Sequence, residues 1–445
     1  MLPPRASTTI AAVSRRCPQC GTEYADAIAF CGNDGAITVQ IPAAGEAPDL
    51  RLGQKYGPYV LCARVADGAM GRVYEGRHAE TKERIAVKVL HDDVARDKVA
   101  VERFKREFET ARDIGSPFVV RVIDFGDTPD RSYYMAMEYL EGTELGALIR
   151  KEGPQSAARV LRLVAQVALG LDDAHSFGVI HRDLKPDNLF LCNGADGDDV
   201  RILDFGSVKL QMETGPKLTA FGTTLGSPYY MSPEQAMGKL DVDNRSDVFA
   251  LAAIIYESLC GKIAFEGATV AQILMKIVNE MPPPLSAVRP GVPAALDDVI
   301  EKGLAKDKKK RHGSTIELVA DALTAFGLAT APDRAAIEAF SKRSLADIEA
   351  ALKSATPPAP KPFGASEPAA VAPHAPSAPA APPRPAAAPR PAAPAMHAPA
   401  MSSAPESFAP PRPSSSLPLI LGIGGVAVVL FAVLAIVLAM FLARG

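Results

Sequence analysis

A glycine-containing loop is the first segment whose residue types and spacing suggest phosphate chemistry. Residues 66–73, ADGAMGRV, have the spacing of a G-x-G-x-x-G-x-V phosphate loop, with Ala66 at the first glycine and Gly68, Gly71 and Val73 at the other defined positions. Glycines let a backbone approach phosphate oxygens without interference from a Cβ atom. Glycine-rich hairpins are common, so this motif alone is a weak signal for a nucleotide site.

A lysine and a glutamate further along the chain strengthen that signal. Lys88 stands 17 residues after Gly71 in the apolar run IAVKVL, and Glu107 follows 19 residues later on a predicted helix. Lys88 would reach α- and β-phosphates if an acidic partner held it, and Glu107 is the candidate partner. The alternatives are an outward-facing lysine and one more surface charge on a polar helix face.

Three polar side chains then occur within six residues, in the segment 181–188, HRDLKPDN. This segment resembles the protein-kinase catalytic loop at every defined position. The resemblance implies that Asp183 accepts the proton of a substrate hydroxyl, Lys185 neutralises charge on the γ-phosphate, and Asn188 holds a Mg²⁺ ion. Three roles so close in sequence require one rigid loop.

A second metal-binding carboxylate is expected at Asp204, which begins a DFG triplet after the apolar strand at 200–203. It would hold Mg²⁺ between the β- and γ-phosphates. The chain contains an earlier DFG at 124–126, but the metal-binding triplet must follow the catalytic loop by one short hairpin. We therefore interpret Asp124 as a coincidental strand end.

With these motifs in order, residues 56–327 resemble the Ser/Thr protein kinases of the eukaryotic-like (Hanks) type found in bacteria. The resemblance implies an α+β, two-lobed fold, with a β-rich N-terminal lobe and a helical C-terminal lobe. It further implies that ATP binds in the cleft with Mg²⁺ or Mn²⁺, and that the γ-phosphoryl group passes to Ser/Thr hydroxyls of protein substrates. Lys185 is the signature of the Ser/Thr class.

The family pattern assigns further residues by position. Those expected around ATP are Val65, Ala66, Gly68, Gly71, Val73, Ala86, Lys88, Glu107, the gatekeeper Met137, and the hinge residues Glu138 and Leu140. Three more are expected to be structural. Glu234, in SPE, would pair with Arg311, and Asp247 would anchor the catalytic loop.

The same pattern implies regulation by phosphorylation. Arg182 precedes the catalytic aspartate, and in such kinases it pairs with a phosphate on the activation segment. The candidate acceptors are Thr219, Thr223 and Thr224, of which Thr219 matches the family best.

Three positions depart from the family pattern without removing a catalytic group: Ala66, Ser227 and Ala252. Two other functions stay open at this point. An inactive kinase-like scaffold is disfavoured by the intact catalytic residues. A small-molecule kinase is disfavoured by the activation segment between Asp204 and Glu234, which only a protein substrate requires.

The N-terminal cysteines suggest a separate metal module. CPQCG at 17–21 resembles a zinc-knuckle turn, and FCGNDG at 30–35 resembles the second knuckle of a zinc ribbon. The ligands would be Cys17, Cys20, Cys31 and Asp34, with the aspartate in the fourth cysteine position, and carboxylate is an acceptable zinc ligand. The alternatives are a metal-free ribbon and a redox pair at Cys17 and Cys20. So small a module favours a structural, protein-contacting role.

Hydrophobic periodicity places these motifs on alternating short strands and then on helices. The predicted strands are 72–78, 84–90, 118–126 and 132–140; the predicted helices are 98–113, 156–177, 245–260, 268–279, 294–304 and 315–326. The β-rich part comes first and the larger helical part second.

Composition divides the chain further. Of 39 prolines, 19 lie between residues 355 and 416, a segment too poor in large apolar residues to fold. The predicted organisation is disorder at 1–16, the cysteine module at 17–38, a linker at 39–55, the kinase domain at 56–327, a helical extension outside the main domain at 328–354, a disordered linker at 355–416, a membrane helix at 417–442 and a tail at 443–445.

The membrane segment rests on 26 residues without a charge. As a helix they span roughly 39 Å, more than the roughly 30 Å of a hydrocarbon core. Because ATP is cytosolic, we expect a single-pass protein of the cell membrane with a cytoplasmic kinase domain. Ala435 and Ala439 form a weak small-xxx-small pair that would suit a homodimer. The net charge of −3 favours no nucleic-acid partner.

Overall fold

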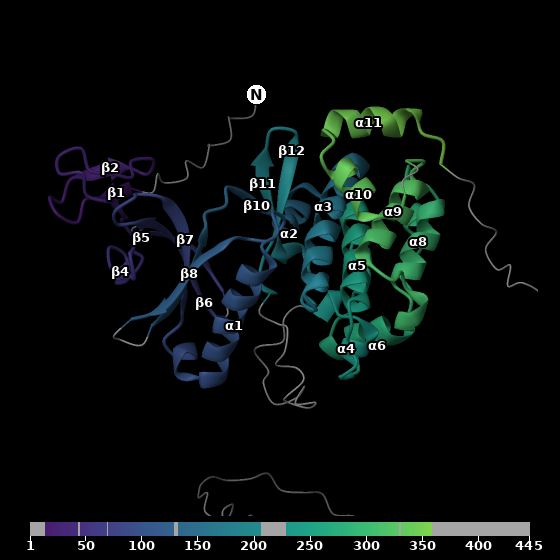
Figure 1. The fold of residues 1–445 in the computed structure, drawn as a ribbon, viewed down its shortest axis with the longest axis horizontal. Helices are drawn as coiled ribbons and strands as arrows, with labels where there is room; N and C mark the ends of the chain where they lie inside the picture. The colour runs from purple at the N-terminus through teal and green to yellow at the C-terminus, as the bar shows by residue number, and fades with distance from the viewer. Residues whose placement is uncertain are drawn as a thin grey trace, which may run out of the picture. The chain divides into compact units, whose positions relative to one another are not determined.

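The computed structural model describes residues 14–42, 45–68, 70–128, 132–205, 228–328 and 331–357. All of them belong to one compact unit. A twisted β-sheet with one long helix lies beside a larger helical lobe, and a small three-stranded sheet precedes both in the chain (Figure 1). The two-lobed α+β fold expected from the sequence is therefore confirmed.

The N-terminal lobe is built on an antiparallel sheet in the order β4-β5-β6-β7-β9-β8. Its strands are β4 (Lys55–Tyr56), β5 (Tyr59–Asp67), β6 (Gly71–His78), β7 (Arg84–Leu90), β8 (Val122–Asp127) and β9 (Tyr133–Glu138). Side chains alternate between the two faces of a strand. On β7, Ile85, Val87 and Val89 enter one apolar cluster, so Lys88 emerges on the opposite face.

Helix α1 (Lys98–Ile114) belongs to the same lobe. The Asp97 side chain caps it by accepting a 2.9 Å hydrogen bond from the Val99 amide, and the helix ends at Gly115 in the left-handed conformation. Phe104, Glu107 and Ala111 are buried at three- and four-residue spacing on one side of the helix. This spacing places the Glu107 carboxylate on the face that packs into the lobe.

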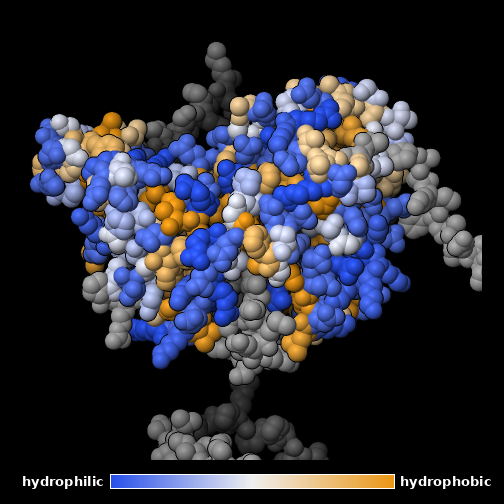
Figure 2. Space-filling model, in the orientation of Figure 1, coloured by the Kyte–Doolittle hydropathy of each residue, from blue (hydrophilic) through white to orange (hydrophobic). Residues whose placement is uncertain are grey.

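The C-terminal lobe is mostly helical. Its helices are α2 (Leu145–Glu152), α3 (Ala157–Ser176), α4 (Pro233–Ala236), α5 (Arg245–Cys260), α6 (Val270–Asn279), α7 (Leu285–Val288), α8 (Ala295–Gly303) and α9 (Thr315–Ala325). A small sheet of β10 (Gly142–Glu144), β11 (Leu189–Gly194) and β12 (Gly197–Ile202) accompanies them. Helices α3 and α5 are buried on nearly every side and form the centre of the core. The face in Figure 2 is mainly hydrophilic, with scattered hydrophobic residues.

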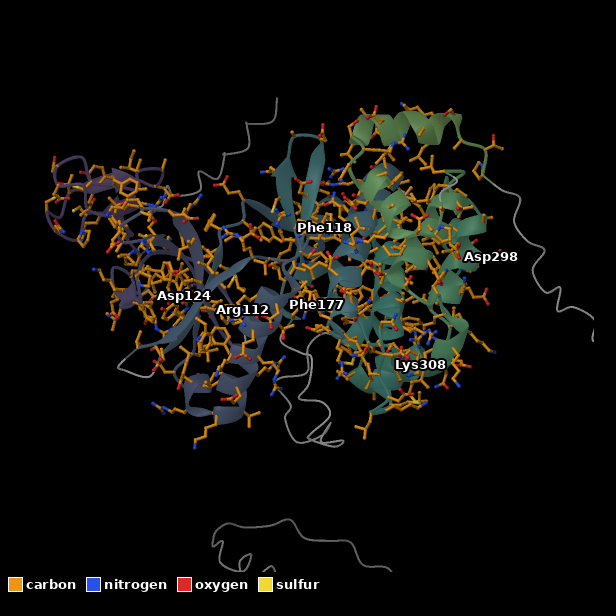
Figure 3. The ribbon with its side chains drawn as sticks, viewed as in Figure 1. Arg112, Phe118, Asp124, Phe177, Asp298 and Lys308 are labelled. Atoms are coloured by element: carbon orange, nitrogen blue, oxygen red, sulfur yellow. The ribbon has the colours of Figure 1, made fainter. Side chains whose placement is uncertain are left out.

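Backbone hydrogen bonds join the two lobes near Phe118, which Figure 3 labels. The Ile202 amide donates to the Phe118 carbonyl at 2.7 Å, and the Val120 amide donates to the Ile202 carbonyl at 3.0 Å. These bonds hold residues 118–120 against the C-lobe hairpin rather than in the N-lobe sheet. The strand predicted at 118–126 therefore begins only at Val122.

The N-terminal module is a sheet in the order β2-β1-β3, formed by β1 (Ser14–Arg16), β2 (Glu23–Ala25) and β3 (Val39–Gln40). Two predicted boundaries are wrong here. Residues 14–16 are not disordered, because β1 is the central strand of this sheet. Residues 39–55 are not a free linker, because they include β3 and the first residue of β4.

The segment predicted as a separate helical extension packs on the C-terminal lobe. Helices α10 (Arg334–Ser341) and α11 (Leu345–Ser354) bury Ile337, Phe340 and Ile348 in the same core as α3 (Figure 1). The Arg334 guanidinium pairs with Asp172 and Asp173 at 2.7 and 2.6 Å. These helices are therefore part of the lobe, contrary to the sequence-based boundary.

Within the described ranges, no helix combines the length and apolar character needed to cross a membrane. The predicted membrane helix at 417–442, the tail at 443–445, and nearly all of the proline-rich segment at 355–416 lie outside those ranges. So do Thr219, Thr223 and Thr224.

Candidate active site

Three charged residues from separate elements meet between the lobes. The Lys88 ammonium on β7 lies 2.9 Å from a Glu107 carboxylate oxygen on α1 and 3.0 Å from an Asp204 oxygen after β12. The Lys88 and Glu107 side chains are 14% and 8% exposed. Burial alone would lower the pKa of Lys88, but the two carboxylates raise it above its usual value. Lys88 therefore remains a cation at the cleft.

The local backbone conformation positions the Asp204 carboxylate. Its φ of 57° is left-handed, an uncommon conformation for a residue with a side chain. The next residue, Phe205, is 1% exposed, and its ring lies 4.7 Å from that of His181. The Lys88 ammonium holds the pKa of Asp204 well below its usual range. The buried Phe205 side chain therefore fixes this segment in place, and the Asp204 carboxylate is ionised.

The predicted catalytic loop holds its polar residues together. The Lys185 ammonium donates to an Asp183 carboxylate oxygen at 2.8 Å, and the Asn188 side-chain amide donates to the Asp183 backbone carbonyl at 2.8 Å. A short 3₁₀ turn, Pro186–Asn188, aligns these groups. The Leu203 amide donates to the Asn188 carbonyl at 2.9 Å, which ties this loop to the segment that carries Asp204.

Asp247 on α5 supports the loop from beneath and is fully buried. Its carboxylate accepts hydrogen bonds from the backbone amides of His181 and Arg182 at 2.9 and 3.0 Å, and lies 2.7 Å from the His175 ring. Burial would raise the pKa of Asp247, but these contacts lower it below its usual value. Arg182 has a strained backbone conformation, with a φ of 65°. The hydrogen bonds to Asp247 stabilise that conformation.

A second buried pair lies below the loop. Glu234 and Arg311 form two parallel hydrogen bonds of 2.8 Å, and their side chains are 5% and 0% exposed. The Ser246 hydroxyl donates a further bond to Glu234 at 2.7 Å. Burial would raise the pKa of Glu234, but Arg311 lowers it to about 2. The side-chain amide of the adjacent Gln235 donates to the Arg182 backbone carbonyl at 2.7 Å, which connects this pair to the loop.

The glycine loop connects β5 to β6. Ala66 pairs with Val73 across the hairpin, and the Gly68 amide donates to the Gly71 carbonyl at 3.0 Å. A Cβ on Gly71 would lie 2.3 Å from the Val89 carbonyl oxygen, so only glycine fits there. Ala66 replaces the first family glycine directly after a register shift in the pairing of β5 with β6.

The other predicted nucleotide contacts line the same face and the connection between lobes. Val73 lies opposite Lys88, and Ala86 precedes Lys88 by two residues, so all three share one face of the sheet. Val65 is 52% exposed at the end of β5. Met137 and Glu138 end β9, and Leu140 follows in the link to β10. The structure thus places Val73, Ala86 and Lys88 on one face of the sheet and the predicted hinge residues in the connection between the lobes.

Sequence reasoning missed some positioning residues. His175 contacts Asp247, and the His181 ring lies 2.9 Å from the Leu203 carbonyl. His175 had only a weak signal, as a polar residue in the last turn of a predicted helix. Asp124, which Figure 3 labels, lies within β8 rather than at its end, and accepts a 3.1 Å hydrogen bond from the Tyr134 hydroxyl.

The N-terminal cysteines form a second cluster. The Cys17, Cys20 and Cys31 sulfurs and an Asp34 carboxylate oxygen all lie within 4.8 Å of one another. The Cys20 and Cys31 sulfurs are 3.5 Å apart, and Cys17 lies 3.3 Å from Asp34. Hydrogen bonds from Thr22 lower the pKa of the Cys20 thiol to about 7. The four predicted ligands therefore converge on one point.

Comparison with known proteins agrees with this geometry. Residues 59–322 match the family model described as protein kinase domain, and the chain belongs to that family. It is 37% identical over 261 residues, 58% of its length, to the serine/threonine-protein kinase pkn3 of Myxococcus xanthus, and covers 48% of that protein. It is 34% identical over 324 residues to the serine/threonine-protein kinase PknH of Mycobacterium tuberculosis, which is 73% of this chain and 50% of PknH.

A solved structure shows the same likeness. The Mycobacterium tuberculosis PknI kinase domain aligns with a TM-score of 0.50 and 29% sequence identity, over 62% of this chain and 98% of that domain. The chain spans half or less of the length of the curated relatives described above. The likeness therefore concerns the kinase domain.

Proposed function

We propose that this protein is a Ser/Thr protein kinase that transfers the γ-phosphoryl group of ATP to protein hydroxyls. The observation that carries the proposal is the convergence of Lys88, Glu107 and Asp204 beside the loop that holds Asp183 and Asn188. These residues match the family motif one by one, and the named relatives are Ser/Thr kinases.

The residues fit bound Mg·ATP, which supplies the transferable phosphoryl group. Asp204 and Asn188 offer oxygen ligands of the kind that Mg²⁺ prefers. Lys88, held by Glu107, would position the α- and β-phosphates. Asp183 would orient the substrate hydroxyl and take its proton, while Lys185, 2.8 Å away, would offset negative charge at the γ-phosphate.

Autophosphorylation tests this proposal. The full-length protein incubated with Mg·ATP should phosphorylate its own Ser/Thr residues, and Asp183→Asn should abolish incorporation. Asp298→Asn, the same exchange in the first turn of α8, is the matched control and should retain full activity. Equal incorporation by wild type and Asp183→Asn would refute the assignment.

We further propose that phosphorylation of Thr219 activates the kinase, with Thr223 and Thr224 as the other candidate sites. The Arg182 Nε atom is buried and has no hydrogen-bond partner within the described residues. This unused donor supports a role for the Arg182 guanidinium in binding a phosphate group. Mass spectrometry of active protein should find phosphate on Thr219. All three threonines unmodified in active protein would refute it.

We propose that Cys17, Cys20, Cys31 and Asp34 bind one Zn²⁺ ion. Three thiolates and one carboxylate are a suitable tetrahedral donor set, and their mutual proximity supports it. Elemental analysis of the full-length protein should give one equivalent of zinc, and Cys17→Ser should lose it. Cys192→Ser, at a half-buried cysteine on β11, is the control and should keep it. No zinc in the wild type would refute the proposal.

We propose that residues 417–442 anchor the kinase in the cell membrane as a single span, with the catalytic domain in the cytoplasm, where ATP is available. The charge-free stretch supports this proposal. Full-length protein should sediment with membranes and require detergent for release, whereas a chain ending at residue 416 should not. Cross-linking of the membrane-bound form would test for a homodimer through the same segment.

A further inference from the structure

A histidine at the end of strand β7 contacts the glycine loop. His91 directly follows Leu90, the last residue of the strand that carries Lys88. Its Nε2 atom lies 2.9 Å from the Gly68 carbonyl oxygen and 3.2 Å from an Asp67 carboxylate oxygen. Both oxygens can only accept a hydrogen bond, so Nε2 carries a proton and the imidazole ring is the donor. The His91 ring therefore connects the end of β5 to the end of β7.

The backbone of His91 is held on both sides. Its amide donates to the Met70 carbonyl at 3.1 Å, which is a second contact with the loop. Its carbonyl accepts a 2.8 Å hydrogen bond from the Ala95 amide, in the short 3₁₀ turn Val94–Arg96. Because the main chain of His91 is fixed, its ring reaches the loop from a rigid point. The position of the Gly68 carbonyl is therefore defined relative to β7.

The Asp67 carboxylate links this contact to β6. One of its oxygens faces His91, and the other accepts hydrogen bonds from the Arg72 guanidinium at 2.8 and 3.0 Å. Arg72 also donates to an Asp49 carboxylate oxygen at 3.1 Å. The Arg72 guanidinium holds the pKa of the Asp67 carboxyl below its usual value, so Asp67 is ionised. The residues that flank the loop are therefore tied to each other and to His91.

A fixed contact matters more in this loop than in most others. Glycine loses more conformational freedom than any other residue when its backbone becomes ordered, and the loop contains Gly68 and Gly71. A loop that is ordered before a ligand arrives costs less free energy to order on binding. In addition, backbone amides attract phosphate oxygens whereas carbonyl oxygens repel them. The hydrogen bond from His91 keeps the Gly68 carbonyl oxygen from facing a bound phosphate.

We propose that His91 is a positioning residue for phosphate binding, whose ring hydrogen bond to the Gly68 carbonyl preorganises the glycine loop for the phosphates of ATP. This inference rests on the proposed kinase function, because it requires that the nucleotide binds at this loop. His91 acts through the loop backbone and takes no part in the phosphoryl transfer itself. Its contact should strengthen the binding of nucleotide phosphates and leave the binding of adenine and ribose unchanged.

Calorimetric titration of the full-length protein tests the proposal. It compares adenosine, which has no phosphate, with the non-hydrolysable imido analogue of ATP in the presence of Mg²⁺. His91→Asn and His91→Gln are a matched pair, because both introduce a neutral amide but only glutamine is long enough to place an N–H donor near the position of Nε2. His91→Asn should weaken binding of the ATP analogue about fivefold, as expected for one lost hydrogen bond, with unchanged adenosine affinity. His91→Gln should stay within about twofold of the wild type.

His78→Asn is the control and should leave both affinities unchanged. His78 ends β6 at the opposite end from the loop, and its Nδ1 atom accepts hydrogen bonds from the Glu80 and Thr81 amides. In a kinetic assay, His91→Asn should raise the KM for ATP with little change in kcat. A wild-type protein that does not bind the ATP analogue would refute the proposed function and this inference together. If the wild type binds, three results would overturn the inference alone: unchanged affinity in His91→Asn, an equal loss for adenosine and the ATP analogue, or a loss in His91→Gln as large as in His91→Asn.

Discussion

Replacing Arg311 by methionine should destabilise the kinase domain strongly, although Arg311 touches no substrate. The Arg311 side chain is fully buried and makes both of its parallel hydrogen bonds to Glu234. Methionine fills a similar volume but leaves a carboxylate that is 5% exposed, with the Ser246 hydroxyl as its one remaining side-chain donor among the residues that the structure describes. A buried charge without its partner is one of the costliest changes a protein can suffer.

Two estimates of the cost agree. Breaking a buried ion pair from one side costs about 3–5 kcal/mol. Independently, Arg311 helps to lower the pKa of Glu234 from 4.5 to about 2, and a shift of that size corresponds to roughly 3 kcal/mol of folding free energy at neutral pH. The expected loss is therefore about 3 kcal/mol, or roughly 5–10 °C in the melting temperature of a domain of this size.

The pH dependence follows from the direction of each shift. In the wild type the pKa of Glu234 is lowered, so its contribution is complete above pH 4.5 and is lost as the pH falls toward 2. In Arg311→Met, burial without the cation raises the pKa of Glu234 above 4.5. The variant should therefore regain stability relative to the wild type as the pH falls from 7 toward 5, because the carboxyl becomes neutral.

Urea unfolding of the full-length protein, followed by circular dichroism at pH 7.5 and 5.0, measures these differences. The double variant Arg311→Met/Glu234→Gln should recover part of the loss. Lys302→Met is the control, because it breaks an exposed pair with Asp321 and should cost no more than about 0.5 kcal/mol. If Arg311→Met unfolds like Lys302→Met, or if its deficit does not shrink at pH 5.0, the argument is wrong.

Three further predictions concern the cleft and its supports. Lys88→Met should lower kcat/KM for ATP by about 10²–10³, measured as autophosphorylation rate against ATP concentration, because it removes the cation between Glu107 and Asp204; a change below threefold would contradict this. Asp247→Asn should lower kcat by about tenfold or more with little change in the KM for ATP, since it weakens the anchor of the His181 and Arg182 amides. Gly71→Ala should cost several times the roughly 1 kcal/mol of Gly115→Ala in urea unfolding, because its Cβ would lie 2.3 Å from a carbonyl oxygen whereas the Cβ at Gly115 meets open space.

Local sequence was sufficient for much of the fold. The helices predicted at 156–177 and 245–260 form at 157–176 and 245–260, because buried helices carry long apolar runs with clear ends. The strand predicted at 84–90 forms over those residues. Strand 118–126 was misplaced because its first residues bond to the C-lobe hairpin, and no periodicity within the strand records that contact.

The predicted site also has one part that local sequence defines and another part that depends on tertiary packing. Asp183, Lys185 and Asn188 lie within six residues, so their type and spacing in the sequence already define a common loop. Lys88 and Asp204 are 116 residues apart, and only the packing of the two lobes brings them to 3.0 Å. The family pattern suggested this meeting, and the tertiary structure supplies its geometry.

The sequence alone determined the family, the order of the lobes and the four residues of the cysteine cluster, because each depends on short segments with a characteristic spacing. Only the tertiary structure decided that α10 and α11 complete the C-lobe core, and that Arg15 of the N-terminal module is buried against Glu75 of the kinase sheet. Such contacts join segments far apart in the chain, and their stability comes from burial and charge pairing in three dimensions, which local composition does not record.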